Sequence, residues 1–109
     1  MEHERAQELL AAARARVEGE LSEIERDGAL EGTERREPGD VGSEDLYEDE
    51  FAEGRREQLR EELAAIARAE DRLRDGTYGR SVESGEPIPD ERLEVRPWAE
   101  RTVQEEESP

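Results

Sequence analysis

Apolar residues in the first quarter of the chain recur with the spacing of one helix face. In residues 2–27 they are separated by steps of three or four, and Glu, Arg, Gln and Ala fill most positions between them. This spacing predicts an amphipathic helix with one narrow apolar stripe. Asp27-Gly28 is a suitable place for the helix to end. The stripe consists of Ala6, Leu10, Ala13, Val17, Leu21 and Ile24.

A second helical pattern covers residues 43–75. Ser43 is a good N-cap, and the acidic Glu44 and Asp45 suit the positive end of a helix. Gly76 fits the left-handed position that often follows a helix end. The predicted apolar face consists of Tyr47, Phe51, Leu59, Leu63, Ile66 and Leu73.

Residues 28–42 separate the two helical patterns and contain four glycines and one proline, which predict a loop. Two helices with one stripe each, joined by a loop, should form an antiparallel hairpin. The predicted fold is therefore mainly α: a long hairpin over residues 1–75 with a tip loop at about 28–42. A helix of 33 residues would be roughly 50 Å long.

Residues 76–105 are rich in turn signals and predict a small C-terminal lobe. A lobe of this size rarely holds itself together without a metal or a disulfide, and the chain has no cysteine. We expect a compact lobe with a short hairpin, a helix from about 97 to 104 and a flexible acidic tail at 106–109. Partial disorder is the alternative. The expected lobe core is Tyr78, Ile88, Leu93 and Trp98, with Val95 and Val103 beside them.

Composition narrows the classes of partner. The chain of 109 residues is 45% charged and 31% hydrophobic, which suits narrow stripes better than a broad core. A net charge of −17 disfavours direct contact with DNA and with anionic membranes, and it favours a basic protein cleft. Solubility alone would explain the charge equally well. Without an apolar span or a signal-peptide pattern, we expect a cytoplasmic protein.

Residues with catalytic or metal-binding chemistry are scarce. His3 is the single histidine, and it lies close to the N-terminus. The sequence has no cysteine nucleophile, no Ser/His/Asp arrangement and no nucleotide-binding fingerprint. We therefore expect neither an enzyme nor a cofactor.

Four short segments carry a resemblance to a known family. Residues 76–79 read GTYG, 85–89 read GEPIP, 91–93 read ERL and 97–99 read PWA. This pattern, after a helical hairpin, resembles the DksA/TraR family of transcription regulators, which implies a coiled-coil stalk and a zinc-finger lobe.

The resemblance also implies where zinc ligands would be. In zinc-binding members of the family, cysteines would occupy the positions of Ser81, Ser84, Thr102 and Glu105. Structural zinc needs about four nitrogen or sulfur ligands, which these side chains do not supply. We expect a degenerate, zinc-free lobe in which Ser81 and Ser84 form local turn hydrogen bonds instead.

The resemblance implies that the hairpin enters the secondary channel of bacterial RNA polymerase and points an acidic tip toward the catalytic centre. In the family motif an Asp is followed two residues later by Ala. Asp40 matches the acid, Gly42 replaces the Ala and Glu37 falls at a second acidic position. Glu44 and Asp45 complete the expected polymerase-contacting tip. The alternative is that Asp40 only begins a turn before the Ser43 cap.

Arg92, Arg96 and Arg101 cluster in sequence around Trp98 and form a possible basic contact. They could contact the rim of the polymerase channel, or a nucleotide alarmone as in some members of the family. The alternative is pairing within the chain, with Glu86, Asp90, Glu91 and Glu94 as partners.

Two functional hypotheses follow. The first is a zinc-free DksA/TraR-like regulator, a monomer that binds RNA polymerase without touching DNA. The rival is an acidic coiled-coil adaptor whose stripes pair between chains, or a decayed paralogue without polymerase function.

Overall fold

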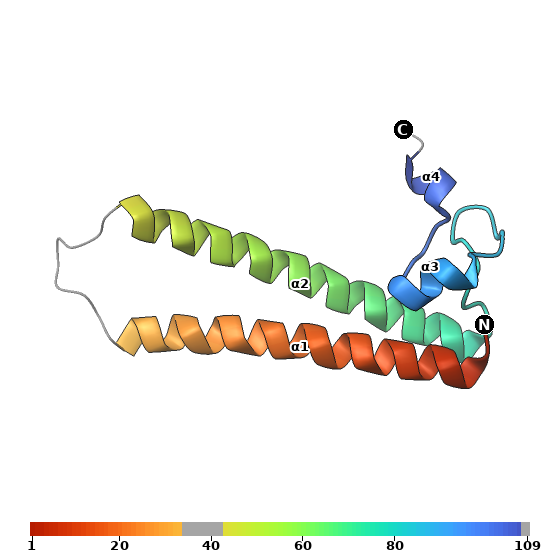
Figure 1. Cartoon of the computed structure of the whole chain (residues 1–109), viewed down its shortest axis with the longest axis horizontal. Coiled ribbons are helices and arrows are strands. Elements are labelled where there is room, and N and C mark those ends of the chain that lie inside the picture. Colours follow the sequence, from red (N-terminus) through yellow and green to blue (C-terminus); the bar gives the residue numbers. More distant parts are fainter. Residues whose placement is uncertain (34–42, 108–109) are drawn as a thin grey trace.

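The computed structural model describes residues 1–33 and 43–107, and it describes side chains for residues 1–26 and 51–107. Helix α1 (His3–Thr33) and helix α2 (Ser43–Asp75) run antiparallel and side by side (Figure 1). We call this pair the stalk. The lobe, residues 76–107, lies at the end of the stalk that holds the N-terminus, and it contains α3 (Asp90–Val95) and α4 (Val103–Glu107). The molecule measures 56 × 32 × 20 Å.

The predicted stripes form the core of the stalk. Leu10 and Val17 of α1 and Leu59 and Ile66 of α2 are fully buried in one cluster, with small alanines filling the space between them. Ion pairs also cross between the helices: Arg14 Nη2 lies 2.5 Å from Glu70 Oε1, Arg55 pairs with Glu20, and Arg60 pairs with Glu25. The partly buried members of the stripes pack alongside: Leu21, Ile24, Leu63 and Leu73.

Two details of the helices differ from the prediction. Helix α1 continues past Asp27-Gly28 to Thr33, because Ala29, Leu30 and Glu31 favour helix and the two glycines, Gly28 and Gly32, cost only about 1 kcal/mol each. Phe51 is 73% exposed, although we placed it in the stripe of α2. It lies eight residues before Leu59, which turns it about 80° around the helix. Ala52, seven residues before Leu59, takes the inward position and is half-buried.

None of the helices in the described part of the chain is long and apolar enough to cross a membrane.

The lobe begins with a change of direction. Gly76 and Gly79 have positive φ angles of 80° and 85°, a conformation that glycine adopts without strain. The expected hairpin is reduced to a single antiparallel bridge between Arg80 and Pro87, which closes the turn at 81–86.

The helices of the lobe are not where we predicted them. The expected helix at 97–104 is wrong: α3 begins directly after Pro89, and α4 begins at Val103. Acidic residues in the first turn favour both short helices. Glu106 and Glu107, which we placed in a flexible tail, belong to α4.

The lobe has a small apolar core of its own. Ile88, Leu93 and Ala99 are buried together, and Tyr78 packs against them while also contacting the core of the stalk. Trp98 is partly buried and packs against the stalk rather than against this cluster. Val95 is 83% exposed and Val103 is exposed as well, so neither joins the core as expected.

Candidate functional site

The structure brings together the four positions that the resemblance assigns to zinc ligands. Ser81 and Ser84 lie on the turn closed by the Arg80–Pro87 bridge, and Thr102 and Glu105 lie at the start of α4. Within the described part of the chain, Ser81 and Thr102 are the only buried polar side chains, with 5% and 7% exposure. We call these four residues the Glu105 cluster.

The first half of the cluster is a turn held by hydroxyl groups. Ser81 Oγ accepts hydrogen bonds from the backbone N–H groups of Glu83 at 3.1 Å and Ser84 at 3.2 Å. Ser84 Oγ accepts one from the N–H of Glu86 at 3.2 Å. These bonds are the local turn interactions expected for Ser and satisfy backbone donors that would otherwise lack partners.

The second half is a capping box, in which two residues of a helix start satisfy each other. The Thr102 N–H donates to Glu105 Oε1 at 2.8 Å, and the Glu105 N–H donates to Thr102 Oγ1 at 3.2 Å. This reciprocal arrangement satisfies two backbone donors at the start of a helix. It explains why α4 forms at Val103 although it is only five residues long.

Glu105 joins the two halves. Side-chain hydrogen bonding with Ser81, followed by the backbone of Thr102 and the side chain of Ser84, lowers the pKa of Glu105 from 4.5 to about 2. Donors that favour the charged form have this effect on a carboxyl group. The Glu105 carboxylate therefore accepts the Thr102 N–H on its own segment, and Ser81 and Ser84 on the other segment favour its charged form.

These residues do not fit a structural zinc ion. Zinc sites of that kind use thiolates and imidazoles, whereas the cluster supplies three hydroxyls and one carboxylate that already accept hydrogen bonds from backbone N–H groups. Among the described side chains, those of residues 1–26 and 51–107, no group of three or more His, Cys, Asp or Glu is placed to hold a metal.

Two of the three predicted basic residues form ion pairs within the lobe. Arg92 Nη2 lies 2.7 Å from Glu106 Oε2, and Arg92 Nε donates to the carbonyl of Arg101 at 3.1 Å. Arg101 pairs with Glu83 at 3.3 Å. Pairing within the chain was the alternative we considered, but the partners are Glu83 and Glu106 rather than the four acids that we named.

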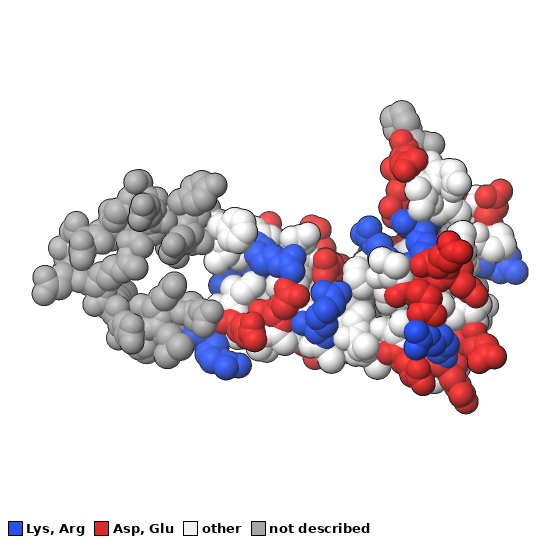
Figure 2. All heavy atoms as spheres, viewed as in Figure 1, with Lys and Arg blue, Asp and Glu red and all other residues white. Residues whose placement is uncertain are grey.

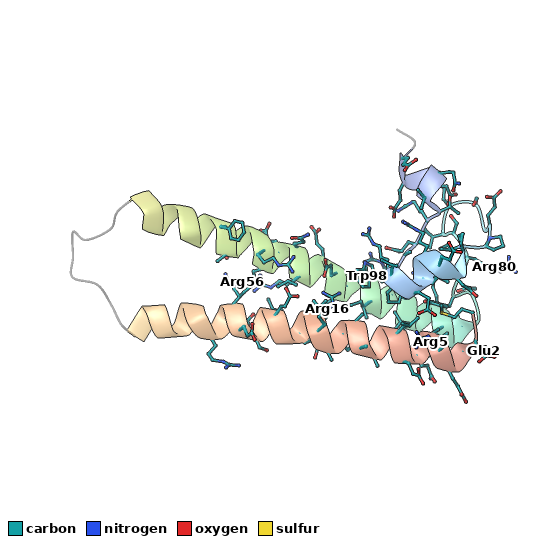
Figure 3. The ribbon with its side chains drawn as sticks, viewed as in Figure 1. Glu2, Arg5, Arg16, Arg56, Arg80 and Trp98 are labelled. Atoms are coloured by element: carbon teal, nitrogen blue, oxygen red, sulfur yellow. The ribbon has the colours of Figure 1, made fainter. Side chains whose placement is uncertain are left out.

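Trp98 marks the place where the lobe meets the stalk. The guanidinium carbons of Arg16, from α1, and Arg96 lie 5.9 Å and 5.8 Å from the centre of its indole ring (Figure 3). Both distances are typical of cation–π contacts. The Tyr78 hydroxyl donates to the carbonyl of Pro97 at 2.8 Å, and burial raises the pKa of Tyr78 to about 12.

An open groove of about 350 Å³ lies in the corner between α2 and the lobe, with Trp98 and Ala65 among its apolar side chains. Its charged lining includes both arginines and glutamates, and Figure 2 shows the two signs interspersed over this face of the molecule. The groove therefore does not present a purely basic surface. Its charged residues are Glu61, Glu62, Arg68, Arg96, Glu100, Arg101 and Glu106.

Sequence reasoning missed Glu100, which accepts hydrogen bonds from Arg68 at 2.7 Å and from Arg72 at 3.4 Å. No sequence spacing signals a pair so distant along the chain.

The predicted tip residues Glu37, Asp40 and Gly42 lie outside the described residues. Glu44 and Asp45 lie in the first turn of α2, and their side chains are also outside the described part.

A solved structure of another protein shares the fold of this chain. The structure of transcription factor DksA2 from Pseudomonas aeruginosa matches 96% of this chain and 80% of that chain, with a TM-score of 0.80 and 26% sequence identity. General stress protein 16O from Bacillus subtilis is 47% identical over 45 residues. That match covers 41% of this chain and only 28% of the relative's length. No protein-family model matches the chain.

Proposed function

We propose that this chain, which has a DksA-like fold and no cysteine, binds RNA polymerase through the secondary channel and modulates transcription without contacting DNA. The observation that carries the proposal is the match of 96% of the chain to a transcription factor, because it includes both the stalk and the lobe. The proposed role is non-enzymatic, and the proposed location is the bacterial cytoplasm, where the polymerase works.

The stalk supports this role physically. A rod whose core is one line of aliphatic side chains is narrow, and its far end lies opposite the lobe (Figure 1). A net charge of −17 favours entry into a basic protein cleft and repels a phosphate backbone. In this proposal Asp40 and Glu37 contact the polymerase near its catalytic centre, with Glu44 and Asp45 behind them.

The lobe would remain outside the channel and contact its rim. Arg92 and Arg101 are already paired with acids of the lobe, which leaves Arg96, stacked on Trp98, as the best placed of the three predicted basic contacts. A nucleotide alarmone at the interface with the polymerase is a further part of the proposal, and Arg96 would be its first contact.

The rival adaptor hypothesis needs stripes that pair between chains. Leu10, Val17, Leu59 and Ile66 are fully buried within one chain, so the hairpin already uses the surface that such pairing would need. We therefore propose a monomer. Sedimentation velocity tests this part: a dimer at micromolar concentration would favour the adaptor.

Binding to purified bacterial RNA polymerase tests the main proposal. A labelled sample should bind at micromolar concentration, binding should weaken with salt, and another secondary-channel factor should compete for the site. Absence of salt-sensitive, competable binding would contradict the proposal.

The tip is tested separately from binding. Asp40→Asn should leave affinity nearly unchanged but reduce the effect on promoter-complex lifetime, because it removes the charge and keeps the shape. Gly42→Ala, which restores the alanine of the family motif, should increase the effect on promoter-complex lifetime. A matched change on the stalk, Glu57→Gln, should alter neither measurement. Equal effects of Asp40→Asn and Glu57→Gln would exclude a special role for the tip.

A further inference from the structure

The lobe is attached to the stalk through little apolar surface. Trp98 and Tyr78 pack against the core of the stalk, while Ile88, Leu93 and Ala99 form a separate cluster inside the lobe. The connecting segment runs from Gly76 to Gly79, and both glycines have positive φ angles, at 80° and 85°. Glycines of this kind can change direction at low cost, so the connection is suited to be a pivot.

An ion pair joins the lobe to the first helix. Arg5 of α1 and Glu94 of α3 form two parallel hydrogen bonds, Nη2 to Oε2 at 2.7 Å and Nε to Oε1 at 3.1 Å. Two-point contacts between Arg and a carboxylate fix orientation as well as distance. The pair is 89 residues apart in sequence, so it constrains the position of the lobe and not the local structure of α1.

A second set of ion pairs joins the lobe to α2. Glu100 accepts hydrogen bonds from Arg68 at 2.7 and 3.2 Å and from Arg72 at 3.4 Å. Arg72 has a side chain that is 15% exposed, and burial lowers its pKa. Its Nε and Nη2 atoms have no hydrogen-bond partner in the described structure. Glu100 therefore supplies the negative charge that offsets the cost of burying this cation. The carbonyl of Glu100 also accepts the Val82 N–H at 2.8 Å, which ties the pair to the Glu105 cluster.

We propose that these ion pairs, Arg5–Glu94 and Arg68/Arg72–Glu100, form a charge latch that sets the angle between lobe and stalk. When the latch is screened or displaced, the lobe pivots at residues 76–79 around the Trp98 contact. A binding partner with acidic groups near Glu94 or Glu100 would then set the angle by competing with these glutamates for Arg5, Arg68 and Arg72. This inference does not depend on binding to RNA polymerase.

The wild-type interface gives the first test. Because the chain has no cysteine, Glu57→Cys on the stalk and Glu91→Cys on the lobe create the only two sites for spin labels. Electron paramagnetic resonance should give a narrow distance distribution at about 0.1 M salt and a broader one, with added longer distances, at about 1 M salt. Labels at Ser22→Cys and Glu57→Cys, both on the stalk, should show no such change. Identical lobe distributions at the two salt concentrations would overturn the proposal.

Charge reversal gives the second test. Arg5→Glu should broaden the lobe distribution even at low salt, and the exchange Arg5→Glu with Glu94→Arg should narrow it again. Arg74→Glu is the matched control, since it changes the net charge equally but reverses a pair, with Asp71, that lies within α2. Failure of the exchange to restore the wild-type distribution, or equal broadening by Arg74→Glu, would contradict the latch. Circular dichroism of each variant distinguishes pivoting from loss of helix.

Discussion

Among the described residues, those of the stalk that are almost fully buried are all aliphatic, whereas those of the lobe include Ser81 and Thr102 as well as Ile88 and Leu93. The stalk repeats one apolar stripe over two long helices, so each added turn adds burial. The lobe has about thirty residues and cannot bury enough apolar surface by that means. It supplements a small core with hydrogen bonds whose partners are charged or backbone groups.

This difference has a physical consequence for how each part responds to change. Aliphatic burial is nearly independent of pH, because it involves no ionisable group. The Glu105 cluster, by contrast, includes one ionised carboxylate, which accepts the Thr102 N–H and is favoured in its charged form by Ser81. Conditions that change the charge of side chains should therefore affect the stability of the lobe more than that of the stalk. Deletions of single groups should also have different effects in the two regions.

The largest expected effect comes from returning the lobe to metal chemistry. The variant Ser81→Cys, Ser84→Cys, Thr102→Cys and Glu105→Cys places four thiols at the positions of the Glu105 cluster, two on the turn and two at the start of α4. Under reducing conditions it should bind one zinc ion, with an apparent free energy on the order of 10 kcal/mol at pH 7. Native mass spectrometry and zinc-dependent thermal unfolding would measure this.

The wild-type chain is the control for that variant and should show no zinc-dependent shift. If the four-cysteine variant binds no zinc, the four positions do not have the geometry of a ligand set. The comparison between a metal-held and a hydrogen-bonded lobe would then fail.

The stalk was predictable from sequence because its signal repeats. Steps of three and four identified the buried residues of α1, and they also located Leu59 and Ile66. The prediction failed at Phe51, where we extended the stripe across eight residues and passed over Ala52, which holds the inward position. In the middle of a long stripe, the buried face of the helix is fixed by many apolar residues, so one wrong assignment matters little. At the end of the stripe the assignment rests on a single residue.

The lobe was less predictable because its elements are short and its contacts are not periodic. The turn bonds of Ser81 were expected, and the sequence TVQE at 102–105 is a capping-box pattern that could have located α4. Nothing in the sequence indicated that Glu105 would also reach Ser81, or that Glu100 would pair with Arg68. Those contacts join segments that only the fold brings together.

A single deletion in the core of the stalk should have the next largest effect. Ile66 is fully buried, so Ile66→Ala should lower the free energy of unfolding by about 2–5 kcal/mol, through lost burial and the cavity that remains. Urea unfolding followed by circular dichroism would measure this. Phe51→Ala removes a larger side chain from an exposed position and should cost about 0.5 kcal/mol or less. Equal costs would show that Phe51 is buried in solution.

A smaller effect is expected from the cap of α4. Thr102→Ala removes the hydroxyl that accepts the Glu105 N–H and should cost about 1 kcal/mol. Thr102→Ser keeps the hydroxyl and should retain most of that stability. Hydrogen exchange of the amides in α4 is a suitable measurement, since the loss should be local to the lobe. Equal exchange rates in the two variants would mean that the hydroxyl does not stabilise the helix.

The last prediction concerns the charge of Glu105, whose contribution to the wild-type chain is lost only in acid. Its pKa is lowered to about 2 in the folded chain from an ordinary value of 4.5, so the folded state favours the ionised form. The stability that this ionisation contributes is complete above about pH 4.5 and is lost as the pH falls toward 2. The protection factors of the lobe amides, which correct the exchange rates for the intrinsic effect of pH, should therefore fall across this window more than those of the stalk.

Glu105→Gln should remove most of this pH dependence, because it replaces the ionisable carboxylate with a neutral amide. Glu91→Gln, an exposed acid of α3, should preserve it. A lobe with the same acid profile in wild type and Glu105→Gln would show that the carboxylate does not hold the two segments together.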